Sequence, residues 1–131
     1  MSQFKSKGGF GRVFRAMNYS FQGIRAALQH EAAFRQEAAL ACIGTVLAFA
    51  LPFTAMQRMI LLGSMGLVLA LELMNSGLEA LVDLVSPEPH ELAGRAKDMG
   101  SAAVFMGLSM AGGAWLVIGT PVVYRLFSVA A

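Results

Sequence analysis

The stretch ELMNSGLEALVD, residues 72–83, lies near the carboxyl end of the long apolar run 55–85. Its polar side chains follow one another at steps of three, four and four residues: Glu72, Asn75, Glu79 and Asp83. At about 100° per residue these positions fall within a sector of about 80°, so the spacing predicts a helix that presents all of them on one face. At about 1.5 Å per residue the run is roughly 46 Å long, more than the ~30 Å of a bilayer core, and part of this helix should protrude.

The composition of the whole chain also indicates a membrane protein. Its 131 residues suit a single domain, and 56% of them are hydrophobic while 14% are charged, which is too apolar a balance for an ordinary soluble domain. Two further apolar segments, about 31–52 and about 91–124, flank the run 55–85. Pro52 should end the first of these, and two prolines in the turn 86–90 should separate the second from the third. We therefore expect an all-α membrane protein with three transmembrane helices, in one domain that takes in the whole chain.

A different pattern precedes the first span, in about residues 8–30. Apolar side chains recur there at steps of three and four: Phe10, Phe14, Met17, Phe21, Ile24 and Leu28. Basic residues lie beside this stripe, so the segment should be an amphipathic helix that lies in the membrane interface and does not cross it. On pattern alone, the helix is either a membrane anchor or a part of the functional site.

The basic residues predict the orientation of the spans. Eight of the ten Lys and Arg residues lie on the side of the amino terminus and of the turn 86–90: Lys5, Lys7, Arg12, Arg15, Arg25, Arg35, Arg95 and Lys97. By the positive-inside rule this side is cytoplasmic, and all eight acidic residues lie toward it. No secretory signal pattern precedes Glu37, which agrees with a cytoplasmic amino terminus. The charge asymmetry favours a membrane surface as the partner of the basic arm, and not nucleic acid.

Ionisable side chains within a membrane helix are costly, which favours a functional role for Glu72 and Glu79. The alternative is polar contact between helices without chemistry. Two carboxylates on one face can divide the work of phosphoryl transfer, the deeper one taking a proton from an alcohol and the other holding Mg²⁺ on a nucleotide. Depth therefore assigns Glu72 as the base and Glu79 as a metal ligand. Glu31, at the entrance to the first span, is placed to be a second ligand.

The sequence allows two interpretations each for Glu37 and Lys97. Glu37 either pairs with Arg35 or another Arg, or takes part in the chemistry. Lys97 either binds nucleotide phosphates as a point charge or only extends to the membrane interface. The sequence has no G-x-x-x-x-G-K-[ST] loop, no convincing zinc-binding set and no G-x-S-x-G elbow, which argues against the common soluble kinases, zinc enzymes and serine hydrolases.

Three runs carry a family resemblance: EAAFRQE at 31–37, ELMNSGLEALVD at 72–83 and HELAGRAKDMGSAAV at 90–104. In order and spacing they resemble the small prokaryotic diacylglycerol kinase family. The resemblance implies a homotrimer in the bacterial inner (cytoplasmic) membrane, with active sites at the cytoplasmic boundary between subunits. It also implies transfer of the γ-phosphate of MgATP to the hydroxyl of diacylglycerol, which gives phosphatidic acid and ADP.

The same resemblance implies roles for individual residues. Glu72 would be the general base, and Glu31 and Glu79 would hold Mg²⁺. Lys97 becomes a phosphate contact, and His90 lies either near the nucleotide base or free in a solvated loop. Further site residues with less defined roles are Arg12, Arg15, Tyr19, Asn75 and Asp98.

Other activities remain to be weighed against this one. Related proteins phosphorylate undecaprenol, although the run 94–104 looks more like the diacylglycerol-specific branch. A small oligomeric transporter also places acidic residues in membrane helices, but near the midplane. A purely structural membrane subunit leaves the acidic cluster without an explanation. The sequence gives no role to Asp83 or to the tail 121–131, and Phe21 stands where the family often has Trp.

Overall fold

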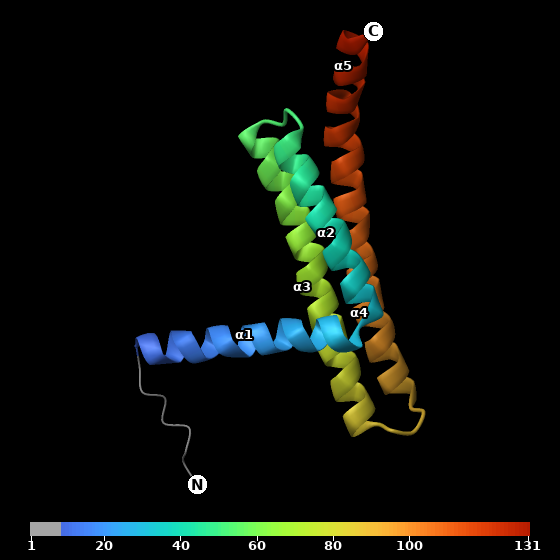
Figure 1. Ribbon diagram of the computed structural model, residues 1–131. Helices are drawn as coiled ribbons and strands as arrows, with labels where there is room; N and C mark the ends of the chain where they lie inside the picture. Colours follow the sequence, from blue (N-terminus) through green and yellow to red (C-terminus); the bar gives the residue numbers. More distant parts are fainter. Residues whose placement is uncertain (1–8) are drawn as a thin grey trace.

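The computed structural model describes residues 9–131, which are almost entirely helical (Figure 1). In chain order the elements are α1 (Phe10–His30), α2 (Ala32–Ala50), α3 (Ala55–Val85), α4 (Glu91–Ala114), the π-helical segment η1 (Trp115–Gly119) and α5 (Thr120–Ala130). Three helices are long and apolar enough to cross a membrane, namely α2, α3 and the continuous run from α4 to α5. The expected all-α fold is therefore confirmed. The expected helix start near residue 8, and the basic residues Lys5 and Lys7, lie outside the described residues.

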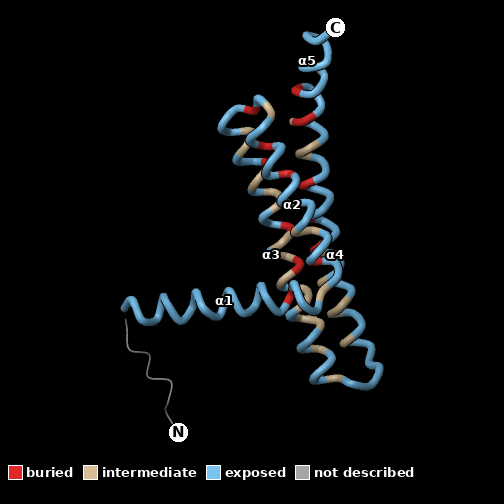
Figure 2. The backbone as a smooth tube through the Cα atoms, viewed as in Figure 1, coloured by how far each residue is buried: buried red, intermediate tan, exposed pale blue. Residues whose placement is uncertain are grey.

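Helix α1 runs crosswise to the three long helices, and its amino-terminal half projects away from them (Figure 1). Within α1 only Ala27 is buried (Figure 2). The apolar stripe predicted from the spacing is exposed along this helix, with Phe10 at 93%. A crosswise helix with an exposed aromatic face suits the plane of a membrane interface, where that face can enter lipid.

The chain changes direction at Glu31, between α1 and α2. Glu31 has an extended backbone, with φ −108° and ψ 110°, and its N–H donates to the carbonyl of Ala27 at 2.8 Å. The sequence pattern predicted a first span from about residue 31, whereas α2 begins at Ala32. Glu31 therefore lies at the corner where the crosswise helix meets the first span.

Hydrogen bonds define the loop between α2 and α3. Thr54 caps α3, because its hydroxyl accepts from the N–H of Gln57 at 3.2 Å and its own N–H donates to Gln57 Oε1 at 3.0 Å. Arg58 reaches back across the loop and donates from Nε to the carbonyl of Ala48 at 2.6 Å and from Nη2 to that of Phe53 at 3.2 Å. These bonds occupy carbonyls that the end of α2 and the loop leave without helical partners.

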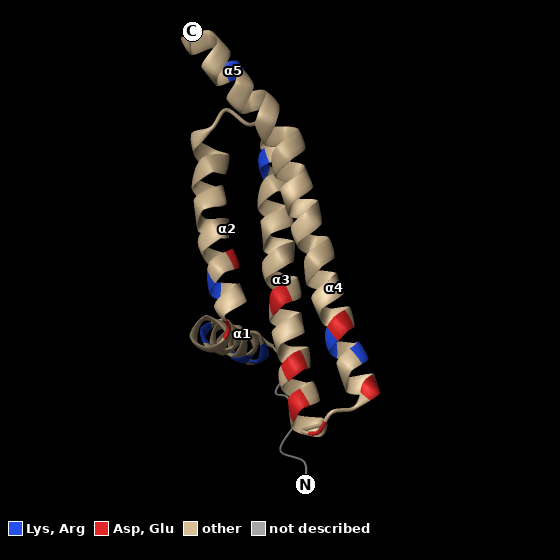
Figure 3. Cartoon of the chain, turned by 90° about the vertical axis from the view of Figure 1, so that its right-hand side faces the viewer, with Lys and Arg blue, Asp and Glu red and all other residues tan. Residues whose placement is uncertain are grey.

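Helices α3 and α4 lie side by side, joined by the non-helical turn 86–90 that the two prolines predicted (Figures 1 and 3). Glycine lets the two backbones approach. A Cβ at Gly107 would lie 2.7 Å from Leu71 Cδ1, so a side chain there would have to displace the end of Leu71. Gly107 thus serves close packing of α3 and α4 within the chain, whereas a Cβ at Gly112 or Gly113 would meet nothing within 4 Å.

The third long helix continues past its expected end at about residue 124 and reaches Ala130. Pro121 has no N–H and usually breaks a helix, but a widened π-helical turn comes just before it. Trp115, the first residue of that turn, packs edge-on against Phe53 with ring centroids 6.2 Å apart. The buried apolar cluster at this end of the bundle consists of Phe53, Leu61 and Val122.

Candidate active site

Acidic side chains gather toward one end of the bundle, on the side of the turn 86–90 (Figure 3). Glu72 of α3 is 6% exposed and is the one charged side chain that is buried among residues 9–131. Glu79 on the same helix and Glu31 at the α1–α2 corner lie close enough for their charges to act on Glu72. The charge of Glu72 acts in the same way on Glu37 of α2. These four residues are called the carboxylate cluster below.

The part of the chain that the structure describes pairs no cation with the carboxylate cluster. Its one ion pair joins Lys97 Nζ to Asp83 Oδ1 at 2.5 Å and bridges α4 and α3. The Lys97 side chain is 38% exposed and that of Asp83 66%, and an exposed pair of this kind contributes about 0–1 kcal/mol. Lys97 is therefore held by a weak, exposed ion pair, and it lies close enough to Glu79 for the two charges to interact. Asp83, for which the sequence gave no role, is that partner.

Glu37 does not pair with Arg35, which contradicts one of its two interpretations. Arg35 Nη1 donates to the carbonyls of Leu28 at 3.1 Å and Gln29 at 3.3 Å, at the end of α1. Glu37 Oε2 is buried and has no hydrogen-bond partner within residues 9–131. The sequence left the role of Glu37 open, and the structure shows it as a neighbour of Glu72.

Asn75 links the carboxylate cluster to α4. Its Nδ2 donates to Glu79 Oε1 at 3.1 Å, across one turn of α3. A carboxylate only accepts hydrogen bonds, so the amide nitrogen is the end that faces Glu79. The other end, Oδ1, is buried on the side of α4 and finds no donor among the described residues. This hydrogen bond orients the Glu79 carboxylate through a neutral group.

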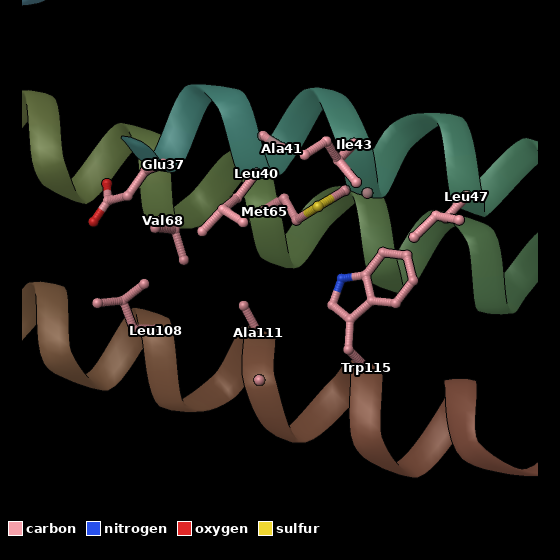
Figure 4. Close-up of a pocket in the computed structure, with 12 residues that line it drawn as sticks. Glu37, Leu40, Ala41, Ile43, Leu47, Met65, Val68, Leu108, Ala111 and Trp115 are labelled. Atoms are coloured by element: carbon pink, nitrogen blue, oxygen red, sulfur yellow. The ribbon is translucent and has the colours of Figure 1, made fainter. Parts of the chain in front are cut away.

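An apolar cavity of about 360 Å³ begins at Glu37 and runs between α2, α3 and α4 to Trp115 (Figure 4). Apart from Glu37 its walls are mainly apolar, with Leu47 of α2, Met65 of α3 and Leu108 of α4 among them. From Glu37 to Leu47 the cavity follows α2 for ten residues, or about 15 Å. It therefore connects the carboxylate cluster with the apolar middle of the bundle.

Comparison with known proteins identifies the family. A family model described as prokaryotic diacylglycerol kinase matches residues 18–119. The chain is 46% identical over 110 residues to the diacylglycerol kinase of Escherichia coli K12, an alignment that covers 84% of this chain and 90% of that protein. The chain belongs to the prokaryotic diacylglycerol kinase family. It is also 45% identical over 107 residues to the diacylglycerol kinase of Haemophilus influenzae (82% of this chain, 91% of that protein) and 42% identical over 117 residues to that of Pseudomonas aeruginosa (89% and 95%).

The family resemblance drawn from the three sequence runs is thereby confirmed, and the chain is a multi-pass membrane protein of this family. Residues 18–119 include the carboxylate cluster, Asn75 and Lys97. Arg12 and Arg15 precede the matched range. Together with Tyr19 they are exposed on the half of α1 that projects away from the long helices (Figure 1). One chain alone therefore does not bring these three residues to its own carboxylate cluster.

The side chains of two further expected site residues form no hydrogen bond or ion pair with the carboxylate cluster in the described structure. His90 is the N-cap of α4, because its Nδ1 accepts from the N–H of Leu92 at 3.1 Å. Neither of its two interpretations included this structural role. Asp98 is exposed on α4, and its side chain makes no hydrogen bond or ion pair with any residue in 9–131.

The carboxylate cluster fits the needs of Mg²⁺ on a nucleotide. No three His, Cys, Asp or Glu side chains among the described residues form a complete metal cage. Mg²⁺, however, commonly takes one or two carboxylates and fills its remaining positions with phosphate oxygens and water. Glu31 and Glu79 have the donor chemistry for this smaller requirement, and neither forms an ion pair with a cation among the described residues.

Proposed function

We propose that this protein transfers the γ-phosphate of ATP to the free hydroxyl of diacylglycerol, which gives phosphatidic acid and ADP. The names of the relatives at 42–46% identity, all diacylglycerol kinases, support this substrate over undecaprenol. The observation that carries the proposal is the buried, unbalanced Glu72, which neighbours Glu37 at the mouth of the apolar cavity. A buried carboxylate thus lies beside one end of a cavity with mainly apolar walls and close enough to Glu31 and Glu79 for their charges to interact, which supports its role as the base.

Glu72 acts as the general base in this proposal. It takes the proton of the lipid hydroxyl while the hydroxyl oxygen forms a bond to the γ-phosphorus. The bond from that phosphorus to the bridging oxygen of ADP breaks at the same time. The proton balances a charge that no cation in the described structure balances. A positioned base contributes about 10²–10⁴-fold to such a reaction, and the remainder comes from alignment and charge neutralisation.

Glu31 and Glu79 hold the Mg²⁺ of MgATP. When bound, this ion neutralises charge on the β- and γ-phosphates. Asn75 keeps the Glu79 carboxylate in one orientation, and Lys97 moves from Asp83 to the phosphates. Further contacts to the nucleotide come from Arg12, Arg15, Tyr19, His90 and Asp98.

The apolar cavity holds one acyl chain of the lipid, with its ester end toward Glu37. Its length of about 15 Å accommodates roughly twelve carbons of an extended chain at about 1.2 Å per bond. The second chain remains in the bilayer, beside the exposed apolar side chains of α2 and α4. This arrangement sets the glycerol hydroxyl at the level of Glu72 without taking the whole lipid out of the membrane.

The proposed enzyme is a homotrimer in the inner membrane with its amino terminus in the cytoplasm. The position of Arg12 and Arg15, on a part of α1 remote from its own carboxylates, supports a site that two subunits share. Mixing Glu72→Gln subunits with Arg12→Ala/Arg15→Ala subunits tests this. Regained activity in mixed oligomers is expected, because some sites then combine intact arginines from one subunit with an intact carboxylate cluster from another. Mixtures as inactive as their components would contradict shared sites.

The function itself is tested by MgATP-dependent transfer of labelled phosphate in mixed micelles, with dioleoylglycerol and undecaprenol offered separately. We expect labelled phosphatidic acid from the wild type and almost none from Glu72→Gln. Labelling of undecaprenol alone would replace the substrate proposed here. If folded wild-type protein labelled neither lipid, the kinase proposal would fail.

A further inference from the structure

Gly100 of α4 lies directly against Asn75 of α3. A Cβ at position 100 would overlap Asn75 Oδ1, and it would come within 3.3 Å of Asn75 Cγ and 3.1 Å of Leu78 Cδ2. The absence of a side chain at Gly100 therefore creates the space that the Asn75 carboxamide occupies. Gly94 of the same helix is different, because a Cβ there would meet nothing within 4 Å.

The Asn75 carboxamide is confined on two sides. On one side Nδ2 donates to Glu79 Oε1 at 3.1 Å. On the other side Oδ1 faces the backbone of α4, where no residue in 9–131 offers it a hydrogen bond. A methyl group at position 100 would push the carboxamide away from α4 or push α4 away from α3. The carboxamide can yield only by rotating, which moves Nδ2 off the Glu79 carboxylate.

We propose that Gly100 is a positioning residue for the metal-binding carboxylate of this kinase. The bare backbone at Gly100 keeps the Asn75 carboxamide seated on Glu79, and the carboxamide in turn fixes the orientation of that carboxylate. The role of Glu79 as a ligand of Mg²⁺ rests on the proposed function above. The small-residue pattern of the third span predicts only close helix packing. The contact with Asn75 indicates that Gly100 also positions the Asn75 carboxamide.

The test compares Gly100→Ala with the matched control Gly94→Ala, since both replace a glycine within α4 and change helix propensity alike. The sequence contains two Asn residues, Asn18 and Asn75, so ¹⁵N-labelled asparagine gives two side-chain amide signals. The variant Asn75→Ala assigns them. We expect Gly100→Ala to shift the Asn75 amide signals in the absence of metal and nucleotide, and Gly94→Ala to leave them in place.

Calorimetric titration of each variant with Mg²⁺, in the presence of a non-hydrolysable ATP analogue, then measures the consequence for metal binding. Loss of a group that orients a metal ligand typically weakens binding about 10–100-fold, and we expect a loss of this order for Gly100→Ala. KM for dioleoylglycerol should stay within about twofold of the wild-type value. The double variant Gly100→Ala/Asn75→Ala should bind Mg²⁺ no more weakly than Asn75→Ala, because the overlap with the carboxamide is then gone and only the flexible end of Leu78, 3.1 Å from the added methyl group, has to yield.

Unmoved Asn75 signals in Gly100→Ala would overturn the proposal, as would shifted signals with unchanged Mg²⁺ binding. Additive losses in the double variant would also overturn it, since they would show that the methyl group acts on packing and not through Asn75. The double variant keeps the test informative if Gly100→Ala alone does not fold. The amide signals are read without substrate, so a failure of the kinase assay in the wild type would refute the proposed function and not this contact.

Discussion

Replacing Glu72 by Gln removes a buried charge while keeping the size of the side chain. Glu72 is 6% exposed, no cation in the described structure pairs with it, and the other members of the carboxylate cluster surround it with like charge. An amide in its place takes no proton from a hydroxyl, and it is not repelled by the neighbouring carboxylates. The Glu72→Gln variant should therefore lose activity and gain stability.

The two effects have different sizes. Loss of a general base lowers kcat by about 10²–10⁴-fold, which corresponds to ~2.7–5.5 kcal/mol of transition-state stabilisation. Burial of an amide costs about 1–3 kcal/mol when its hydrogen bonds are incomplete, and burial of an unbalanced carboxylate costs more. After the cost of the amide is subtracted, we expect a net gain of about 1–3 kcal/mol in the free energy of unfolding.

Both quantities can be measured on the same preparation in mixed micelles: kcat with dioleoylglycerol, and thermal unfolding without nucleotide or Mg²⁺. The matched control is Glu91→Gln, an exposed carboxylate in the first turn of α4. It should keep its kcat and lose about 0.3–1 kcal/mol of helix-terminal stabilisation. A clear loss of stability in Glu72→Gln would refute the reasoning, because it would make Glu72 a polar contact between helices. An unchanged kcat would refute its role as the base.

Three other changes test separate parts of the molecule. Glu79→Gln should raise the Mg²⁺ concentration for half-maximal activity about 10–100-fold with little effect on KM for the lipid, and equal Mg²⁺ dependence would remove Glu79 from the metal site. Gly112→Leu extends into open space in the apolar cavity and should displace about two methylenes of an acyl chain, worth ~0.8 kcal/mol each. KM for dioleoylglycerol should then rise about tenfold, while Gly113→Leu, outside the cavity lining, should not change it; equal effects would contradict acyl binding there. Arg58→Ala loses two charged hydrogen bonds and a contact with the Phe49 ring, and it should lower the free energy of unfolding by about 2–4 kcal/mol. Thermal inactivation checks this, with Arg58→Lys expected to lie in between, and an unchanged rate would show that the loop holds without Arg58.

The apolar pattern of the sequence was sufficient to predict the long helices, because few backbone conformations are stable in a bilayer. A polar backbone in lipid must satisfy its own hydrogen bonds, so an apolar run of span length becomes a helix. Periodicity did not predict how far the third helix extends. The apolar pattern ended near residue 124, whereas the helix passes through the π-helical turn at Trp115–Gly119 and Pro121 and continues to Ala130.

The candidate site was predictable where its residues share one helix. Glu72, Asn75 and Glu79 lie on one face of α3 by spacing alone, and the structure joins two of them by a hydrogen bond. Contacts between helices were not predictable in the same way. Whether Glu37 meets Arg35 or Glu72 depends on how α2 rotates against α3, and the contact of Gly100 with Asn75 depends on the register of α4 against α3. Helical spacing within one segment carries no information about either.

In the proposed reaction, the depth of the groups along α3 explains how one long helix can serve a substrate in the membrane and another in water. Glu72 and Glu79 are seven residues apart, or about 10.5 Å along the helix axis, and Asp83 lies about 6 Å further toward the turn 86–90. A lipid whose acyl chain lies in the cavity beside Glu37 reaches only the first of these levels. A nucleotide that arrives from water meets Lys97 and Asp83 first and then Glu79. The hydroxyl and the γ-phosphate can therefore meet between Glu72 and Glu79 although neither substrate leaves its own phase. The proposed role of Glu72 as a base explains why no cation in the described structure pairs with it. A cation beside Glu72 would stabilise the fold, but it would also stabilise the ionised carboxylate and so weaken its ability to take up the hydroxyl proton.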